Sequence, residues 1–154
     1  LDVFSASALG RLDAVQQALS DNPQLLNALS SDGFPPLGLA AFFGHPDVAA
    51  WLLDQGANPR QIADNAMRVQ PLHSAVAGGH FEIARQLLEH GADVNARQQG
   101  EFTPLHAAAQ NGQADMIKLL LEHGADRALA TDDGKRPADL AREAGHEALV
   151  QGLS

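Results

Sequence analysis

The fold of this chain is decided by one stretch of sequence, Thr103-Pro104-Leu105-His106-Ala107-Ala108-Ala109-Gln110-Asn111-Gly112. Thr103 is a natural N-cap, because its hydroxyl can accept a hydrogen bond from a backbone N–H two or three residues further on. Pro104 suits the first helical position, where its missing N–H costs nothing. Gly112 tolerates a positive φ and therefore predicts the end of the helix. A second apolar helix follows, from Met116 to a glycine at Gly124.

The same pattern recurs along the whole chain. A proline followed eight positions later by a glycine occurs as Pro36…Gly44, Pro71…Gly79, Pro104…Gly112 and Pro137…Gly145, in steps of 35, 33 and 33 residues. Residues 4–19 keep the pattern without the proline. The chain is thus expected to form five helix pairs, with approximate units 1–31, 32–66, 67–99, 100–132 and 133–154. Since one helix pair cannot bury its apolar faces alone, the pairs must stack.

A period near 33 with Thr-Pro-Leu-His-x-Ala and Gly-Ala-Asp motifs resembles the ankyrin-repeat family over essentially the whole chain. The resemblance implies an all-α solenoid of about five helix-turn-helix units with hairpin-like finger loops, curved around a concave groove, in a single domain 1–154. The first and last units lack parts of the motif, as capping repeats do, so we expect a complete array.

Composition narrows the function. Nineteen acidic residues against ten basic ones give a net charge of −9, which repels nucleic acid and anionic membrane surfaces. The absence of cysteine excludes disulfides and thiol chemistry. No apolar run reaches the length that spans a bilayer. We expect a cytoplasmic monomer. The chain starts at Leu1 without a methionine, so the possibility of a removed N-terminal leader stays open.

The sequence predicts no catalytic residue, cofactor or metal site. Seven histidines recur at equivalent positions, one repeat apart, whereas zinc needs three or four ligands around one point. The family resemblance implies that His73 and His106 bridge backbone groups of adjacent fingers. Neither a phosphate-binding glycine loop nor a Gly-x-Ser-x-Gly motif is present.

In the resembled family, partners dock on the concave face and the fingers. Carried over by position, the candidate partner-binding residues are Phe34, Phe42, Phe43, Met67, Arg68, Val69, Phe102, Gln110 and Asn111. Grouped aromatic side chains are typical of binding hot spots. In the alternative interpretation, Phe42 and Phe43 fill space between units, and Phe34 and Phe102 pack under the fingers. Trp51, on a second helix, is expected to pack between units.

Three departures from the repeat stand out. The finger before Pro71 is two residues longer than the two that follow, which indicates either a binding insertion or a tolerated loop extension. The helices at Pro36, Pro71 and Pro137 lack the capping threonine and are expected to be weaker for it. Gly38 lies inside a helix and is expected to allow a neighbouring helix to approach closely.

These observations predict a non-catalytic module that binds another protein on its concave face. A partner with an apolar anchor and a basic flank would match a groove that is aromatic at its front and acidic at its back. One alternative is a structural or regulatory domain of a longer parent protein, acting in cis. Another is an accessory protein that uses its histidines for a small molecule or a metal.

Overall fold

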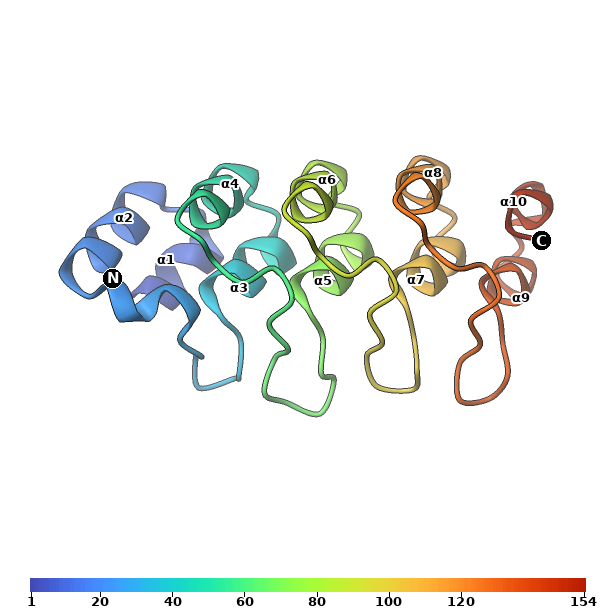
Figure 1. The fold of residues 1–154 in the computed structure, drawn as a ribbon, viewed down its shortest axis with the longest axis horizontal. Coiled ribbons are helices and arrows are strands. Elements are labelled where there is room, and N and C mark those ends of the chain that lie inside the picture. The colour runs from blue at the N-terminus through green and yellow to red at the C-terminus, as the bar shows by residue number, and fades with distance from the viewer.

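The computed structural model describes residues 1–154 and consists almost entirely of short helices joined by loops (Figure 1). The first helices of the pairs are α1 (Val3–Leu9), α3 (Pro36–Phe43), α5 (Pro71–Ala77), α7 (Pro104–Gln110) and α9 (Pro137–Glu143). The second helices are α2 (Leu12–Asp21), α4 (Pro46–Asp54), α6 (Phe81–Glu89), α8 (Ala114–Glu122) and α10 (Glu147–Leu153). A 3-10 helix, η1 (Pro23–Asn27), follows α2. The five predicted helix pairs are confirmed.

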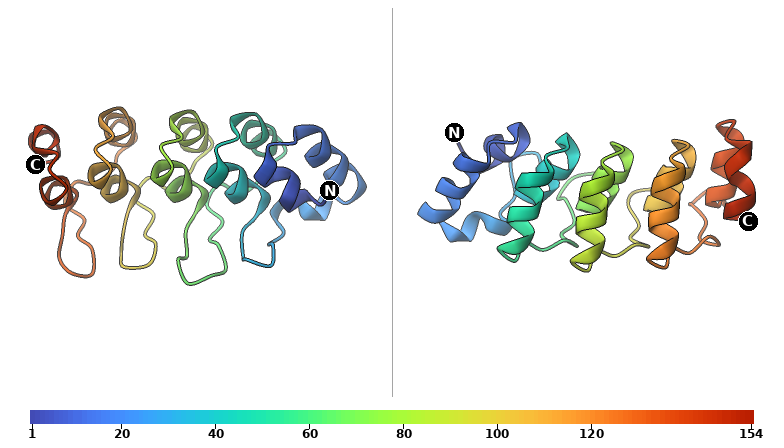
Figure 2. Two further views of the ribbon diagram at one scale, coloured as in Figure 1. Left: turned by 180° about the vertical axis from the view of Figure 1, so that it is seen from behind. Right: turned by 90° about the horizontal axis from the view of Figure 1, so that it is seen from above.

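The pairs stack side by side along the long axis of the molecule (Figures 1 and 2). First helices form one row and second helices another, and the finger loops all project on the side of the first helices. Small and branched apolar residues fill the space between the rows, so that 30 buried residues form one continuous core cluster. None of the ten α-helices has the length and apolar character that crossing a bilayer requires.

The stretch that decided the fold forms α7 as predicted. The Thr103 hydroxyl accepts a hydrogen bond from the His106 N–H at 3.4 Å, and the Nδ1 atom of His106 accepts one from the Thr103 N–H at 3.1 Å. This reciprocal arrangement is a capping box, with histidine in place of the usual glutamate. Gly112 lies just beyond the helix at a φ of +69°.

Two of the helices without a capping threonine keep half of this arrangement. Nδ1 of His73 accepts from the Gln70 N–H at 2.9 Å, and Oδ2 of Asp139 accepts from the Arg136 N–H at 2.8 Å. The second bond lowers the pKa of the Asp139 carboxyl. These helix starts therefore lack only the bond that the Thr103 hydroxyl accepts in α7, because the third helical residue satisfies the N–H of the capping residue. The expected weakening is limited to that one bond.

Each finger is a narrow hairpin closed by one backbone hydrogen bond. The closing pairs, at 2.8–2.9 Å, are Ser30–Phe34, Ala63–Val69, Gln98–Phe102 and Thr131–Lys135. Three residues lie between the partners in three of the fingers, whereas five, residues 64–68, lie between them in the finger before Pro71. The two additional residues are therefore confined to the tip of that finger.

The finger tips are also joined to one another. The Asp64 N–H donates to the Gly33 carbonyl at 2.8 Å, the Gln99 N–H to the Met67 carbonyl at 3.0 Å, and the Asp132 N–H to the Gly100 carbonyl at 2.9 Å. One backbone hydrogen bond thus connects each pair of neighbouring finger tips, and Nδ2 of Asn65 adds a side-chain bond to the Asp32 carbonyl at 3.1 Å. The four fingers form a continuous edge along the array, which fixes the position of each tip relative to the next.

Candidate functional site

Three of the predicted residues form an aromatic cluster at α3, which we call the phenylalanine triad: Phe34, Phe42 and Phe43. The ring centroids of Phe34 and Phe42 lie 6.4 Å apart, and those of Phe42 and Phe43 lie 5.0 Å apart with the rings edge to face. Phe42 and Phe43 are 51% and 52% exposed. They do not fill the space between the first two units, so that alternative is wrong for both. Aromatic rings that contact one another and are half exposed are typical of binding hot spots.

Gly38 packs against the segment that precedes α3. A Cβ atom at Gly38 would lie 3.1 Å from Cδ of Pro35 and 3.7 Å from Cδ1 of Phe34. The expectation that Gly38 admits a neighbouring helix is therefore wrong, because side chains of its own unit occupy that space. In α5 and α7 the same position holds His73 and His106.

A histidine at position 38 could not make the capping bond that it makes elsewhere. Its Nδ1 atom accepts from the N–H of the N-cap residue in α5 and α7. The N-cap residue of α3 is Pro35, which has no N–H. Pro35, Gly38 and the triad are therefore parts of one local departure from the repeat.

The other predicted residues are dispersed. The Phe102 ring is half-buried and lies 5.3 Å from the ring of His106, not against the triad. Met67 and Arg68 are exposed in the tip of the long finger. Gln110 and Asn111 are exposed at the end of α7.

Val69 is a correction to the predicted site. It closes the hairpin of the long finger, and its side chain is only 6% exposed. Phe34 and Phe102, which close their hairpins at the equivalent position, are only half-buried. Val69 supports the finger but offers no side-chain surface to a partner.

A second set of histidines connects three of the helix pairs to the pair that precedes each of them. Nε2 of His45 bonds the Ala8 carbonyl at 2.8 Å, Nε2 of His80 bonds the Phe42 carbonyl at 3.3 Å, and that of His146 bonds the Gln110 carbonyl at 3.1 Å. Each carbonyl lies at the end of a first helix, where no intrahelical donor remains. The sequence showed that these histidines are equivalent but did not reveal their acceptors. His80 thereby holds the backbone of the triad.

One interface lacks this histidine. Gln113 stands at the equivalent position between the third and fourth units, and its Oε1 atom is buried without a hydrogen-bond partner. The matching carbonyl, that of Ala77, receives only a 3.4 Å bond from Nδ2 of Asn111. The interface between the third and fourth units is therefore the least well connected of the four at this position.

Replacing Gln113 with histidine is expected to stabilise the array by about 0.5–1.5 kcal/mol, the net value of one hydrogen bond. The imidazole can reach the Ala77 carbonyl and removes an unsatisfied buried oxygen. Urea unfolding followed by circular dichroism measures the gain. The reciprocal variant, His146→Gln, should lose a similar amount. Equal stability of Q113H and the unmodified chain would show that the position contributes nothing.

His73 and His106 bridge the fingers, as the family resemblance implied. Nε2 of His73 bonds the Ala96 carbonyl at 2.8 Å, and Nε2 of His106 bonds the Lys135 carbonyl at 3.0 Å. Both side chains are buried. With Nδ1 accepting, Nε2 carries the proton, so each ring is held as one neutral tautomer. Burial lowers the pKa of both imidazoles from the ordinary value of 6.5.

Acid is expected to destabilise the protein below pH 6.5. The unfolded chain binds protons at His73 and His106 near pH 6.5, whereas the folded chain binds them only at lower pH. The stability contributed by the neutral rings is therefore complete above pH 6.5 and is lost as the pH falls, by at most about 1.4 kcal/mol per pH unit for each histidine. Urea unfolding at pH 7.5, 6.5 and 5.5 measures the slope, and proton NMR titration assigns it. A flat profile over this range would contradict the assignment.

The bridging histidines have no free ring nitrogen with which to bind a metal. Both ring nitrogens of His73 and His106 are engaged with backbone groups. Nowhere do three histidine or carboxylate side chains come together in a geometry that could hold an ion. The observed chemistry of the histidines is structural.

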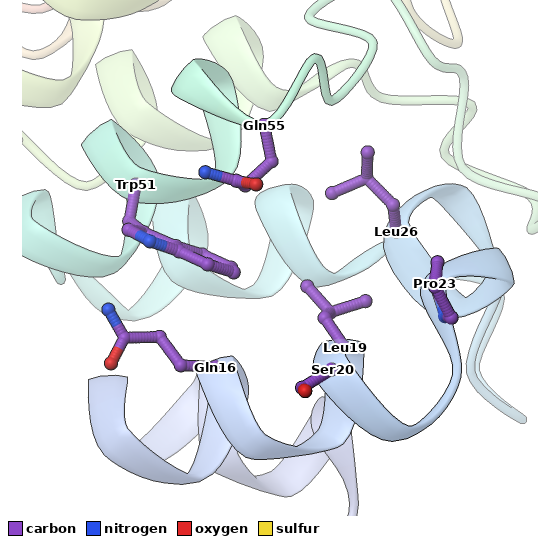
Figure 3. A pocket seen from close by; sticks show the side chains of 7 residues that line it. All are labelled: Gln16, Leu19, Ser20, Pro23, Leu26, Trp51 and Gln55. Atoms are coloured by element: carbon purple, nitrogen blue, oxygen red, sulfur yellow. The ribbon is translucent and has the colours of Figure 1, made fainter.

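A separate hollow lies between α2, η1 and α4 (Figure 3). Its volume is about 310 Å³, and it is lined by Gln16, Leu19, Ser20, Pro23, Leu26, Trp51 and Gln55. Trp51 is half-buried and packs against the core, as predicted. The hollow arises where η1 replaces the Gly-Ala turn found after α4, α6 and α8. It belongs to the row of second helices, so it is distinct from the triad on α3.

Comparison with known proteins identifies the class to which this fold belongs. A family model described as ankyrin repeats (3 copies) matches residues 3–98, and one described as ankyrin repeats (many copies) matches residues 87–141. The chain belongs to the ankyrin-repeat family. Ankyrin repeats are in general non-enzymatic modules for protein–protein interaction.

Particular relatives carry such repeats as a small part of a larger chain. The chain is 33% identical over 102 residues to mouse "Ankyrin repeat and SAM domain-containing protein 6", covering 66% of this chain and 11% of that protein. It is 45% identical over 60 residues to "Ankyrin repeat and KH domain-containing protein mask" of Drosophila melanogaster, covering 39% of this chain and 1% of that protein. The chain thus spans about a tenth or less of the length of these relatives.

Proposed function

We propose that this chain is a non-catalytic protein-interaction module whose binding site is centred on the phenylalanine triad. The observation that carries the proposal is the contact among three phenylalanine rings, two of them half exposed. Folding normally covers such area, and an exposed cluster indicates a surface that a partner covers.

The scaffold supports this assignment. Gly38 and Pro35 depart from the repeat beside Phe34, whose ring centroid lies 6.4 Å from that of Phe42. His80 fixes the Phe42 backbone from the next unit. The triad is thereby preorganised on a rigid helix, which reduces the entropy lost on binding. Met67 and Arg68, at the exposed tip of the long finger, extend the proposed site.

The double variant Phe42→Ala/Phe43→Ala tests the proposal. We expect the loss of two hot-spot rings to weaken binding of the natural partner by at least about 30-fold, since one such residue contributes about 2 kcal/mol or more. Affinity capture from native lysate with quantitative mass spectrometry identifies the proteins that depend on the triad, and titration with the purified partner gives the affinity.

Phe81→Ala is the matched control, because Phe81 is a 41% exposed phenylalanine at the start of a second helix. It should bind as the unmodified chain does. Thermal unfolding of all three proteins checks that the fold is retained. Capture of the same proteins by the folded double variant would disprove the proposed site.

A further inference from the structure

We propose that the partner presents a basic protein segment with one bulky apolar side chain, which seats on the phenylalanine triad while its lysines or arginines face the acidic finger tips. This inference rests on the proposed function and adds the chemistry of the partner. It follows from how charge is distributed over the edge formed by the fingers.

Four carboxylates of the finger tips form no ion pair within the chain. The side chains of Asp32, Asp64 and Asp132 are exposed, and none takes part in an ion pair. Asp133 is bonded only by the Thr131 hydroxyl, at 2.5 Å. These carboxylates are available to a cation from outside.

The cations of the same region are mostly neutralised. Nη1 of Arg97 lies 3.0 Å from Oε2 of Glu101, and Nζ of Lys135 lies 2.6 Å from Oε1 of Glu143. Arg68 is the one finger-tip cation without an ion pair. Four unpaired carboxylates therefore face one unpaired cation, and the net charge of −9 reinforces the local field.

The acidic tips begin next to the triad. Asp32 lies two residues before Phe34 in the same finger. The hydrogen bond from the Asp64 N–H to the Gly33 carbonyl, at 2.8 Å, holds the second tip beside the first. In the proposed complex, one bound segment contacts the rings and these two carboxylates together.

The same charges disfavour other occupants. A second copy of this chain would bring a further charge of −9, so self-association through the triad is opposed. Anionic surfaces are repelled for the same reason. A basic segment gains both from burial of the rings and from electrostatic steering, which is strongest at low salt.

Selection from a display library of random 16-residue peptides tests the inference. On the unmodified chain we expect enriched peptides to contain several lysines or arginines and a leucine, methionine, phenylalanine or tryptophan. For one enriched peptide, the variant Asp32→Asn/Asp64→Asn should weaken binding about 3- to 10-fold in 50 mM NaCl and much less in 300 mM. The variant Asp115→Asn/Glu122→Gln removes the same charge from exposed positions on α8 and should change binding less than twofold.

The outcomes separate this inference from the proposed function. Enrichment of acidic or uncharged peptides, or unchanged affinity of D32N/D64N, overturns the basic partner while leaving the triad as the site. Failure to enrich any peptide, or equal binding by F42A/F43A, overturns both. A doubled mass in light scattering that returns to the monomer mass in F42A/F43A would show that a second copy occupies the triad and would also overturn the inference.

Discussion

Replacing His106 with alanine is expected to lower the free energy of unfolding by about 3–5 kcal/mol. The side chain is fully buried and bonds two backbone groups, the Thr103 N–H and the Lys135 carbonyl. Alanine leaves the buried Thr103 N–H without a partner, which costs about 1–3 kcal/mol. It also removes one of the two hydrogen bonds to the Lys135 carbonyl, which keeps the bond from the Thr131 N–H at 2.9 Å. The space vacated by the ring adds a cavity term. Urea unfolding at pH 7.5 measures the loss.

Two comparisons assign this loss to the hydrogen bonds. Asparagine at position 106 can keep the acceptor for the Thr103 N–H, as Asp139 does for Arg136, so His106→Asn should recover part of the stability. His90→Ala removes an exposed ring that bonds the Gln86 carbonyl at 2.8 Å and lies 3.8 Å from Oδ1 of the exposed Asp54, and it should cost less than about 1 kcal/mol. If H90A and H106A lose equal stability, burial of the bridging histidine is not what matters.

Replacing Gly44 with alanine is expected to lower the free energy of unfolding by about 2–4 kcal/mol. Gly44 has a φ of +80°, which costs an L-residue about 1–2 kcal/mol. An added Cβ would also lie 2.5 Å from Cε1 of His80. The imidazole must move, and its bond to the Phe42 carbonyl is lost. Chemical unfolding measures both effects together.

Gly145 separates the two effects. It occupies the same position in the last unit at a φ of +86°, but no atom lies within 4 Å of its virtual Cβ. Gly145→Ala should therefore show the backbone cost alone. The double variant Gly44→Ala/His80→Ala should lose little beyond the sum of the backbone cost and the lost histidine bond. A loss in G145A as large as that in G44A would rule out the histidine contact as a cause.

Much of the fold could be predicted because the same helix-start and helix-end residues recur in several units. The cap at Thr103, the start at Pro104 and the positive φ at Gly112 are local properties that individual residues determine. Because the motif recurs with a nearly constant period, the same local properties are expected in the other units. The equivalence of the bridging histidines was visible in the same way, since each falls at a fixed distance from a proline.

What could not be predicted depends on contacts that the period does not contain. Sequence equivalence placed Val69 with Phe34, but it did not show that Val69 points inward. Gly38 looked like a gap for a neighbouring helix, because nothing in the pattern reveals that the Phe34 ring occupies it. The acceptors of His45, His80 and His146 lie 36–38 residues away in sequence and emerge only when the units are stacked.

The bonds between finger tips set a minimum length for a peptide that contacts all four finger tips. They hold Asp32 and Asp132 three units apart, and neighbouring units are about 10 Å apart, as packed helices are. A peptide must then cover about 30 Å, which takes roughly nine residues in extended form. Because the units are rigidly connected, that distance can change only by insertion or removal of a whole repeat. We therefore expect the array to discriminate among peptides by length as well as by chemistry.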